Sequence, residues 1–344
     1  LPATALLLLP LLVAATAAAE PAPVPVDARR AAANRALAWL DAHLLRLPEF
    51  EGTPKKPFTF ATAGLAYLMA PAREGAPDPL PRIVSYLERW LRHLRERVAD
   101  PEELPPGMGA FGSWSAIQYT WPVAQSMLFF GELRARGLYP RKTGRALAHA
   151  EALLLAAQHE SGGWGHHEVS ERDPSEDERR RKWPSEMLGV ARRYPPTLVS
   201  SSATVATGLA ACLAATEQPE PEAIPAARRY FVAAQLDNGN FPYDPSQRTS
   251  HRSMTGVSRT GSALLAMYWL GFARDDPRVE RSLAFVQRHQ DYLAEAHGSP
   301  ALNLMQSAWA LKLYDDEAWA SFRATYYPRL LAKQTDEGDL ACIC

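Results

Sequence analysis

A short motif that occurs three times constrains the fold of this chain more than any other feature. In each copy a helix-length run of residues ends at a glutamine, and a glycine follows at the fourth position. The three pairs are Gln158/Gly162, Gln235/Gly239 and Gln334/Gly338. An aromatic residue follows the glycine in the first two copies, Trp164 and Phe241. Recurrence at a fixed offset is typical of repeat architectures, in which each unit buries its apolar face against the next one.

Segments of helical length fill the rest of the chain and alternate between two kinds. Amphipathic segments, with apolar residues at helical spacing, are expected at 28–47, 80–98, 144–158, 225–235, 278–289 and 320–334. Segments that are small or apolar on nearly every side, and therefore suited to the interior, are expected at 59–70, 117–134, 198–216, 260–271 and 301–314. The pattern predicts an all-α fold of about five to six helical hairpins. Inner helices ringed by outer ones would form an α/α toroid, which is the predicted fold class.

The two ends of the chain carry further expectations. Residues 1–19 have the apolar core and small-residue cleavage site of a signal peptide, with a retained anchor helix as the alternative. Residues 20–27 read as an extended linker, and 28–344 as one repeat domain with a charged insertion at 168–196, either a lid or a disordered segment. The chain starts without Met or a basic leader, and its last amphipathic segment has no apolar partner, so we expect truncation at both ends. Secretion or export to the periplasm is predicted, with no integral membrane span after cleavage.

Charge and cysteine content exclude some classes of partner. The chain has 37 Lys and Arg against 38 Asp and Glu, so its formal net charge of −1 gives no support for binding nucleic acid. The three cysteines fit no disulfide framework. Cys212 lies in an alanine-rich segment and is expected to be a small buried apolar residue.

The residues of the motif carry a family resemblance. Gln158-His-Glu-Ser-Gly-Gly-Trp and Gln235-Leu-Asp-Asn-Gly-Asn-Phe resemble the repeat of the prenyltransferase/squalene–hopene cyclase superfamily. The resemblance extends from about Ala28 to the end, and is closer to a secreted bacterial branch of unassigned chemistry. In that superfamily the repeats build α/α toroids, and the Gln and aromatic residues tie outer helices to neighbouring turns. The motif is structural, so the resemblance implies a fold and not an activity.

The catalytic signatures of the superfamily are missing from the sequence. Its cyclases use an Asp-x-Asp-Asp acid, which does not occur here, and the pairs Asp275–Asp276 and Asp315–Asp316 are expected to cap helices or form turns. Its protein prenyltransferases hold zinc with an Asp, a Cys and a downstream His. Asp339 and Cys342 have the wrong offset for that set, so we predict no metal and no cofactor, and Cys342 is the one metal-ligand candidate.

Three groups of residues are candidates for binding a ligand. Arg259 and His251 lie in a polar stretch before an expected inner helix, where they could present a cation and an imidazole to an anionic ligand. The alternative is that Ser258 or Thr260 caps the helix and Arg259 pairs with a carboxylate. A second group is the adjacent pair His166 and His167. The third is aromatic, and consists of Trp114, Tyr119, Trp121, Tyr243, Tyr268 and Trp309.

Three functions remain open from the sequence. The favoured one is an exported toroid without enzymatic activity that binds a small molecule, peptide, glycan or lipid in its central cavity. The second is a cyclase- or prenyltransferase-like enzyme acting on an apolar substrate, which a cavity that is apolar throughout, with one buried carboxyl group of raised pKa, would favour. The third is a polysaccharide-processing enzyme, which requires Arg259, His251 or His166 close to carboxylates.

Overall fold

A computed structural model describes residues 24–43, 57–70, 78–99, 119–165, 197–216, 219–245, 256–294 and 300–339. These residues form α-helices joined by turns, and no β-strand occurs among them. In chain order the helices are α1 (Val26–His43), α2 (Pro57–Met69), α3 (Leu80–Ala99), α4 (Thr120–Ala135), α5 (Pro140–Ala156), α8 (Val199–Thr216), α9 (Ala223–Ala234), α10 (Gly256–Trp269), α11 (Pro277–Arg288), the 3₁₀-helix η4 (Gln290–Tyr292), α12 (Pro300–Tyr314) and α13 (Asp316–Lys333).

Each helix expected from the sequence is present, and the boundaries differ by a few residues. The start of α10 is the informative difference, because it begins at Gly256 and not at Thr260. Thr260 Oγ1 donates a hydrogen bond to the Gly256 carbonyl (2.8 Å), one turn earlier in the same helix. Ser258 and Thr260 therefore lie inside α10, and the expectation that one of them caps it is wrong.

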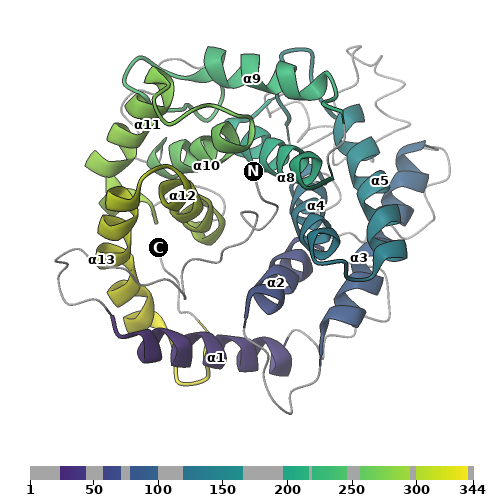
Figure 1. The fold of residues 1–344 in the computed structure, drawn as a ribbon, viewed down its shortest axis with the longest axis horizontal. Helices are drawn as coiled ribbons and strands as arrows, with labels where there is room; N and C mark the ends of the chain where they lie inside the picture. The colour runs from purple at the N-terminus through teal and green to yellow at the C-terminus, as the bar shows by residue number, and fades with distance from the viewer. Residues whose placement is uncertain are drawn as a thin grey trace, which may run out of the picture. The chain divides into compact units, whose positions relative to one another are not determined.

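Two compact units make up the chain. One comprises Leu1–Pro48, Ala63–Leu80 and Phe231–Cys344, and the other comprises Glu49–Thr62 and Pro81–Tyr230. In the first unit α10 lies beside α11 and α12, and α12 lies beside α13 (Figure 1). In the second unit α4 lies beside α5 and α8 (Figure 1).

The inner and outer helices differ in burial as predicted. Every residue of α4 from Val123 to Leu133 is buried, and so is every residue of α10 from Gly256 to Met267. The outer helix α11 instead buries one face, made of Val279, Ser282, Leu283, Phe285 and Val286. Small residues on the inner helices permit this packing. A Cβ at Gly208 of α8 would lie 2.7 Å from the Ala124 carbonyl oxygen of α4.

The three Gln–Gly turns share one backbone geometry. In each, the residue after the glutamine donates from its backbone amide to the carbonyl four residues later, and the glycine amide donates back to that first residue. The first set of bonds is His159 to Gly163 (2.9 Å), Leu236 to Asn240 (2.9 Å) and Thr335 to Asp339 (3.0 Å). The second is Gly162 to His159 (2.8 Å), Gly239 to Leu236 (2.9 Å) and Gly338 to Thr335 (3.0 Å). The sequence repeat is therefore a structural repeat.

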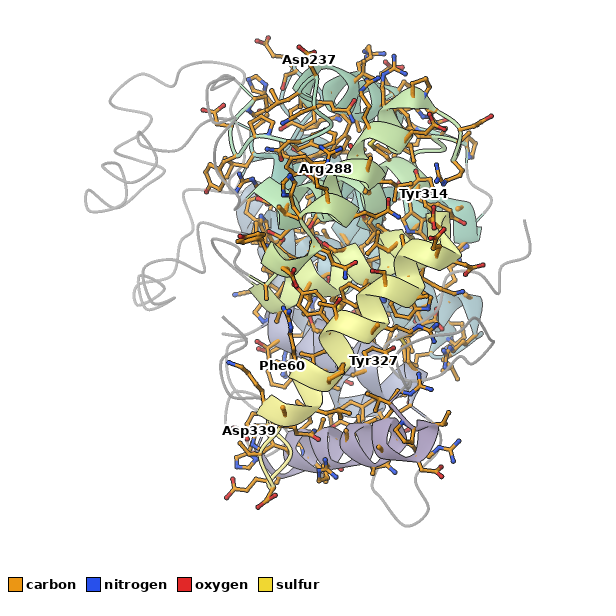
Figure 2. The ribbon with its side chains drawn as sticks, turned by 90° about the vertical axis from the view of Figure 1, so that its left-hand side faces the viewer. Phe60, Asp237, Arg288, Tyr314, Tyr327 and Asp339 are labelled. Atoms are coloured by element: carbon orange, nitrogen blue, oxygen red, sulfur yellow. The ribbon has the colours of Figure 1, made fainter. Side chains whose placement is uncertain are left out.

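The glutamine of each turn bonds to the next outer helix. The Nε2 atoms of Gln158, Gln235 and Gln334 donate to the carbonyls of Ala223 in α9 (2.9 Å), Arg278 in α11 (2.8 Å) and Ala32 in α1 (2.8 Å). The third contact lies within the first unit and joins the turn after α13 to the first helix of the chain. Figure 2 shows this turn, marked by Asp339, against α1. The last repeat is thus hydrogen-bonded to α1 through its glutamine, as the earlier ones are to α9 and α11.

The glycines of the turns are required for two reasons. Gly162, Gly239 and Gly338 have φ values of 87°, 85° and 100°, a left-handed conformation that other residues rarely adopt. A Cβ at these positions would also overlap a backbone carbonyl oxygen of the next outer helix, that of Ala226, Arg281 or Arg35. The fixed position of the glycine therefore reflects both backbone conformation and close packing between repeats.

Other local predictions are also confirmed. Asp276 caps α11 by accepting from the Arg278 amide (2.8 Å), and Asp315 caps α13 by accepting from the Ala318 amide (2.9 Å). Cys212 is buried, and burial raises the pKa of its thiol to about 12. It is therefore the small interior residue that the sequence predicts.

Candidate functional site

The aromatic residue of each turn fixes the start of the inner helix that follows. The Trp164 amide donates to Ser202 Oγ in α8 (2.8 Å), and the Phe241 amide donates to Thr260 Oγ1 in α10 (3.1 Å). Both aromatic side chains are fully buried. The two bonds set a common register for the repeats, in which Ser202 corresponds to Thr260. The residue before each of them therefore also corresponds, and Arg259 occupies the position that Ser201 has in α8.

Arg259 is a buried cation in the first turn of α10. Only 5% of the residue is exposed, and its guanidinium carbon lies 5.7 Å from the centre of the Tyr243 ring. Its Nε atom is buried and has no hydrogen-bond acceptor among the residues that the structure describes. Burial lowers the pKa of Arg259 to about 10, and Tyr243 acts in the opposite direction. Within the described ranges no ion pair joins Arg259 to a carboxylate, so the alternative that it pairs with one stays open only for carboxylates outside those ranges.

The corresponding position in the second unit has a different environment. Ser201 accepts a hydrogen bond from the Trp121 indole Nε1 (2.5 Å), so α4 supplies a donor for its hydroxyl. Trp121 was a candidate for binding a ligand, and the structure assigns it this interhelical bond. Position for position, α8 carries a bonded hydroxyl where α10 carries a guanidinium whose Nε atom has no hydrogen-bond partner among the described residues.

The inner helices carry many buried polar side chains. In the first unit these are Ser258, Arg259, Thr260 and Ser262 of α10 and Asn303, Gln306 and Ser307 of α12. In the second they are Thr120, Gln125, Ser126 and Glu132 of α4 and Ser200, Ser201, Ser202, Thr204 and Thr207 of α8. Buried polar groups are normally hydrogen-bonded. Among them, Arg259 Nε, Asn303 Nδ2, Thr207 Oγ1 and both amide atoms of Gln125 have no partner among the described atoms.

Two carboxylate side chains are buried among the residues that the structure describes. Glu132 of α4 is 1% exposed, and burial raises its pKa although Arg136 pairs with its Oε1 atom and lowers it. Asp244 is also buried and directly follows Tyr243. No cluster of three or more His, Cys, Asp or Glu side chains that could hold a metal ion was found among the described residues. Across the same residues, no helix combines the length and the apolar character needed to cross a membrane.

The structure brings some of the predicted ligand-binding residues together and leaves others apart. Arg259 and Tyr243 are in contact in the first unit. Tyr119 is buried at the start of α4 in the second unit, and Tyr268 packs edge-to-face on Tyr314 at the far end of α10. His166, His167, His251, Trp114 and Cys342 lie outside the described residues, as do the insertion at 168–196 and the predicted signal peptide.

Sequence reasoning missed three buried polar residues. Gln125, Glu132 and Asn303 are buried in segments that the sequence pattern predicts to be interior because their neighbours are apolar or small. The available signal was the polar residue itself, since an amide or carboxyl group within an otherwise buried helix is rare unless it has a partner. Periodicity did not separate them from residues that point to solvent.

Comparison with known proteins identifies the fold. No protein-family model and no curated protein matches the chain. Among solved structures it is similar to the apo form of the type II terpene cyclase MstE from Scytonema, with a TM-score of 0.53 and 17% sequence identity. The match covers 92% of this chain and 82% of that cyclase.

The class of protein follows from the repeat geometry and this match together. The chain has the all-α toroid fold of type II terpene cyclases, as the resemblance of its repeats predicts. At 17% identity the likeness establishes the fold alone, because one fold can host many unrelated functions.

Proposed function

We propose that this protein is an exported toroid that binds a polar ligand among its inner helices, anchored by Arg259. The observation that carries the proposal is the buried guanidinium at the start of α10, whose Nε atom has no hydrogen-bond partner in the described part of the chain. Burying a cation without a counter-charge is unfavourable, so such groups in proteins are normally paired or serve a ligand. Arg259 is 5% exposed and forms no ion pair with a carboxylate in the described ranges.

The chemistry of the inner helices favours a polar ligand over a hydrocarbon. A site for an isoprenoid chain gains affinity by removing apolar surface from water, and each unpaired polar group facing the chain reduces that gain. Here α10 and α12 carry serine, threonine, asparagine, glutamine and arginine side chains in their buried parts. The absence of an Asp-x-Asp-Asp tetrad from the sequence agrees with binding without cyclisation.

Native mass spectrometry of the protein purified gently from its own host tests this proposal. The parent protein is expected to carry a bound small molecule, and Arg259→Met is expected to lose it. Arg288→Met is the matched control, since Arg288 (Figure 2) is an exposed arginine in the last turn of α11. An empty parent, or an Arg259→Met variant that retains the same mass, would overturn the proposal. Release from cells with residues 1–19 present, and retention without them, tests the export part.

A second function is favoured by one observation. Glu132 is a buried carboxyl group whose pKa is raised, the feature expected of an acid acting on an apolar substrate. The named activity of the structural neighbour is terpene cyclisation. Incubation with polyprenyl substrates, followed by product analysis, distinguishes this function from ligand binding. A cyclised product lost in Glu132→Gln would support it, and unchanged substrate would count against it.

A further inference from the structure

Two inner helices of the first unit run side by side in the same direction. At one end Ser262 of α10 lies 3.2 Å from Asn303 Oδ1 of α12. At the other end the Tyr268 and Tyr314 rings are 5.3 Å apart, and Tyr314 donates to the Phe272 carbonyl just after α10 (3.1 Å). Early residues therefore meet early residues and late residues meet late ones. The parallel arrangement brings the N-terminal ends of α10 and α12 together.

Each of these N-terminal ends carries a buried nitrogen donor that finds no acceptor among the described residues. Arg259 is the fourth residue of α10, and Asn303 is the fourth residue of α12. Asn303 is 1% exposed, and its Nδ2 atom has no hydrogen-bond partner in the described part of the chain. Ser262 follows Arg259 by three residues, so both lie on one face of α10. Because Ser262 contacts Asn303, Arg259 and Asn303 lie at the N-terminal ends of two helices that touch each other there.

At Arg259, Ser262 and Asn303, the hydrogen-bonding capacity left over among the described residues is that of donors. Asn303 Oδ1 accepts from the Ser262 hydroxyl, whose proton is shared with the Ser258 carbonyl (3.2 Å). What is left over is the N–H of Arg259 and the NH₂ of Asn303. The backbone adds to this preference, because each helix N-terminus carries a partial positive charge of about half an elementary charge. Two parallel N-termini, one guanidinium and one amide together favour a group that only accepts hydrogen bonds and is negative.

We infer that Asn303 and Arg259 together bind an oxyanion group of the ligand, a carboxylate, sulfate or phosphate. The inference rests on the proposed function and adds the charge of the ligand and a second residue that recognises it. The guanidinium supplies charge, and the amide supplies a donor from the neighbouring helix. Such a pair discriminates against a neutral ligand of similar shape, because that ligand leaves the buried cation without a counter-charge.

Inorganic probes test the inference without knowledge of the natural ligand. Thermal unfolding of the ligand-free protein is followed with potassium phosphate, sulfate or acetate, at constant ionic strength set with potassium chloride. At least one oxyanion is expected to stabilise the parent in a saturable manner. Asn303→Leu, which removes the amide, is expected to weaken that effect at least tenfold in apparent affinity. Asn303→Asp, which keeps the shape and adds a negative charge, is expected to abolish it.

Two further variants separate the possible failures. Arg259→Met is expected to abolish the response, and Gln125→Leu is the control, since it removes an unpartnered buried amide from the second unit. Suppose that Arg259→Met loses the stabilisation by oxyanions, while the Asn303 variants fold and are stabilised like the parent. In that case the role of Asn303 is refuted and the proposed function stands. If no oxyanion stabilises the parent although native mass spectrometry finds a ligand that depends on Arg259, the oxyanion assignment is refuted. If neither measurement finds an effect of Arg259, both proposals fail.

Discussion

Replacing Arg259 with methionine should stabilise the ligand-free protein while removing its ligand. Burial lowers the pKa of Arg259 to about 10, so the folded protein holds this cation less favourably than water does. At about 1.4 kcal/mol for each pKa unit, keeping the guanidinium charged inside the fold costs about 3 kcal/mol. The contact with the Tyr243 ring, at 5.7 Å, returns about 0.5–2 kcal/mol. Methionine fills much of the same volume without a charge.

The net effect at neutral pH is therefore a gain of about 1–2 kcal/mol in the free energy of unfolding. Urea denaturation of ligand-free parent and Arg259→Met measures this difference. The exposed Arg288→Met substitution, which changes the net charge equally, should stay within about 0.5 kcal/mol of the parent. With the ligand bound the order should reverse, because only the parent gains the free energy of binding.

The dependence on pH has a definite sign. For a cation whose pKa is lowered by folding, the cost is present at all pH values below the folded pKa and is relieved as pH rises through it. The advantage of Arg259→Met should thus be constant around neutral pH and shrink above about pH 10. A ligand-free Arg259→Met variant that is less stable than the parent by more than about 1 kcal/mol would show that the guanidinium is paired, and the reasoning would be refuted.

Three further predictions concern the repeat and the interior. Gly239→Ala should destabilise the fold by more than about 3 kcal/mol, since the new Cβ overlaps the next outer helix. Gly137 also has a positive φ, but a Cβ there would meet no atom within 4 Å, so Gly137→Ala should cost about 1 kcal/mol. Equal losses of stability in urea denaturation would contradict the packing role of Gly239. Gln235→Ala should lower the free energy of unfolding by about 1–3 kcal/mol, because its hydrogen bonds to α11 are lost. The control Gln287→Ala, at an exposed position, should change it by about zero. An unchanged melting temperature for Gln235→Ala would argue against the role of Gln235 in joining the repeats. In a variant whose other two cysteines are serines, Cys212 should resist iodoacetamide at pH 8.5 until the protein unfolds, as its raised pKa implies; rapid labelling of the folded protein would be the contrary result.

The sequence by itself determined the helices and the way in which they repeat. Burial of one face or of all faces leaves a period in the order of apolar residues, so outer and inner helices could be told apart. The offset between Gln235 and Gly239 is likewise local, because the glutamine, the glycine and the bonds of the turn lie within six consecutive residues. The caps formed by Asp276 and Asp315 belong to the same class of local signal.

The tertiary structure decided which side chains find partners. Ser201 and Arg259 occupy the same register position, yet within the described ranges Ser201 has a hydrogen-bonded neighbour and Arg259 Nε has none, because α4 places the Trp121 indole beside Ser201. Asn303 acquires its importance from the parallel packing of α12 on α10, which joins residues 41 positions apart in sequence. The third turn meets α1, the first helix of the chain, through Gln334. Such contacts depend on how separate elements pack, and a local period or offset in the sequence carries no information about them.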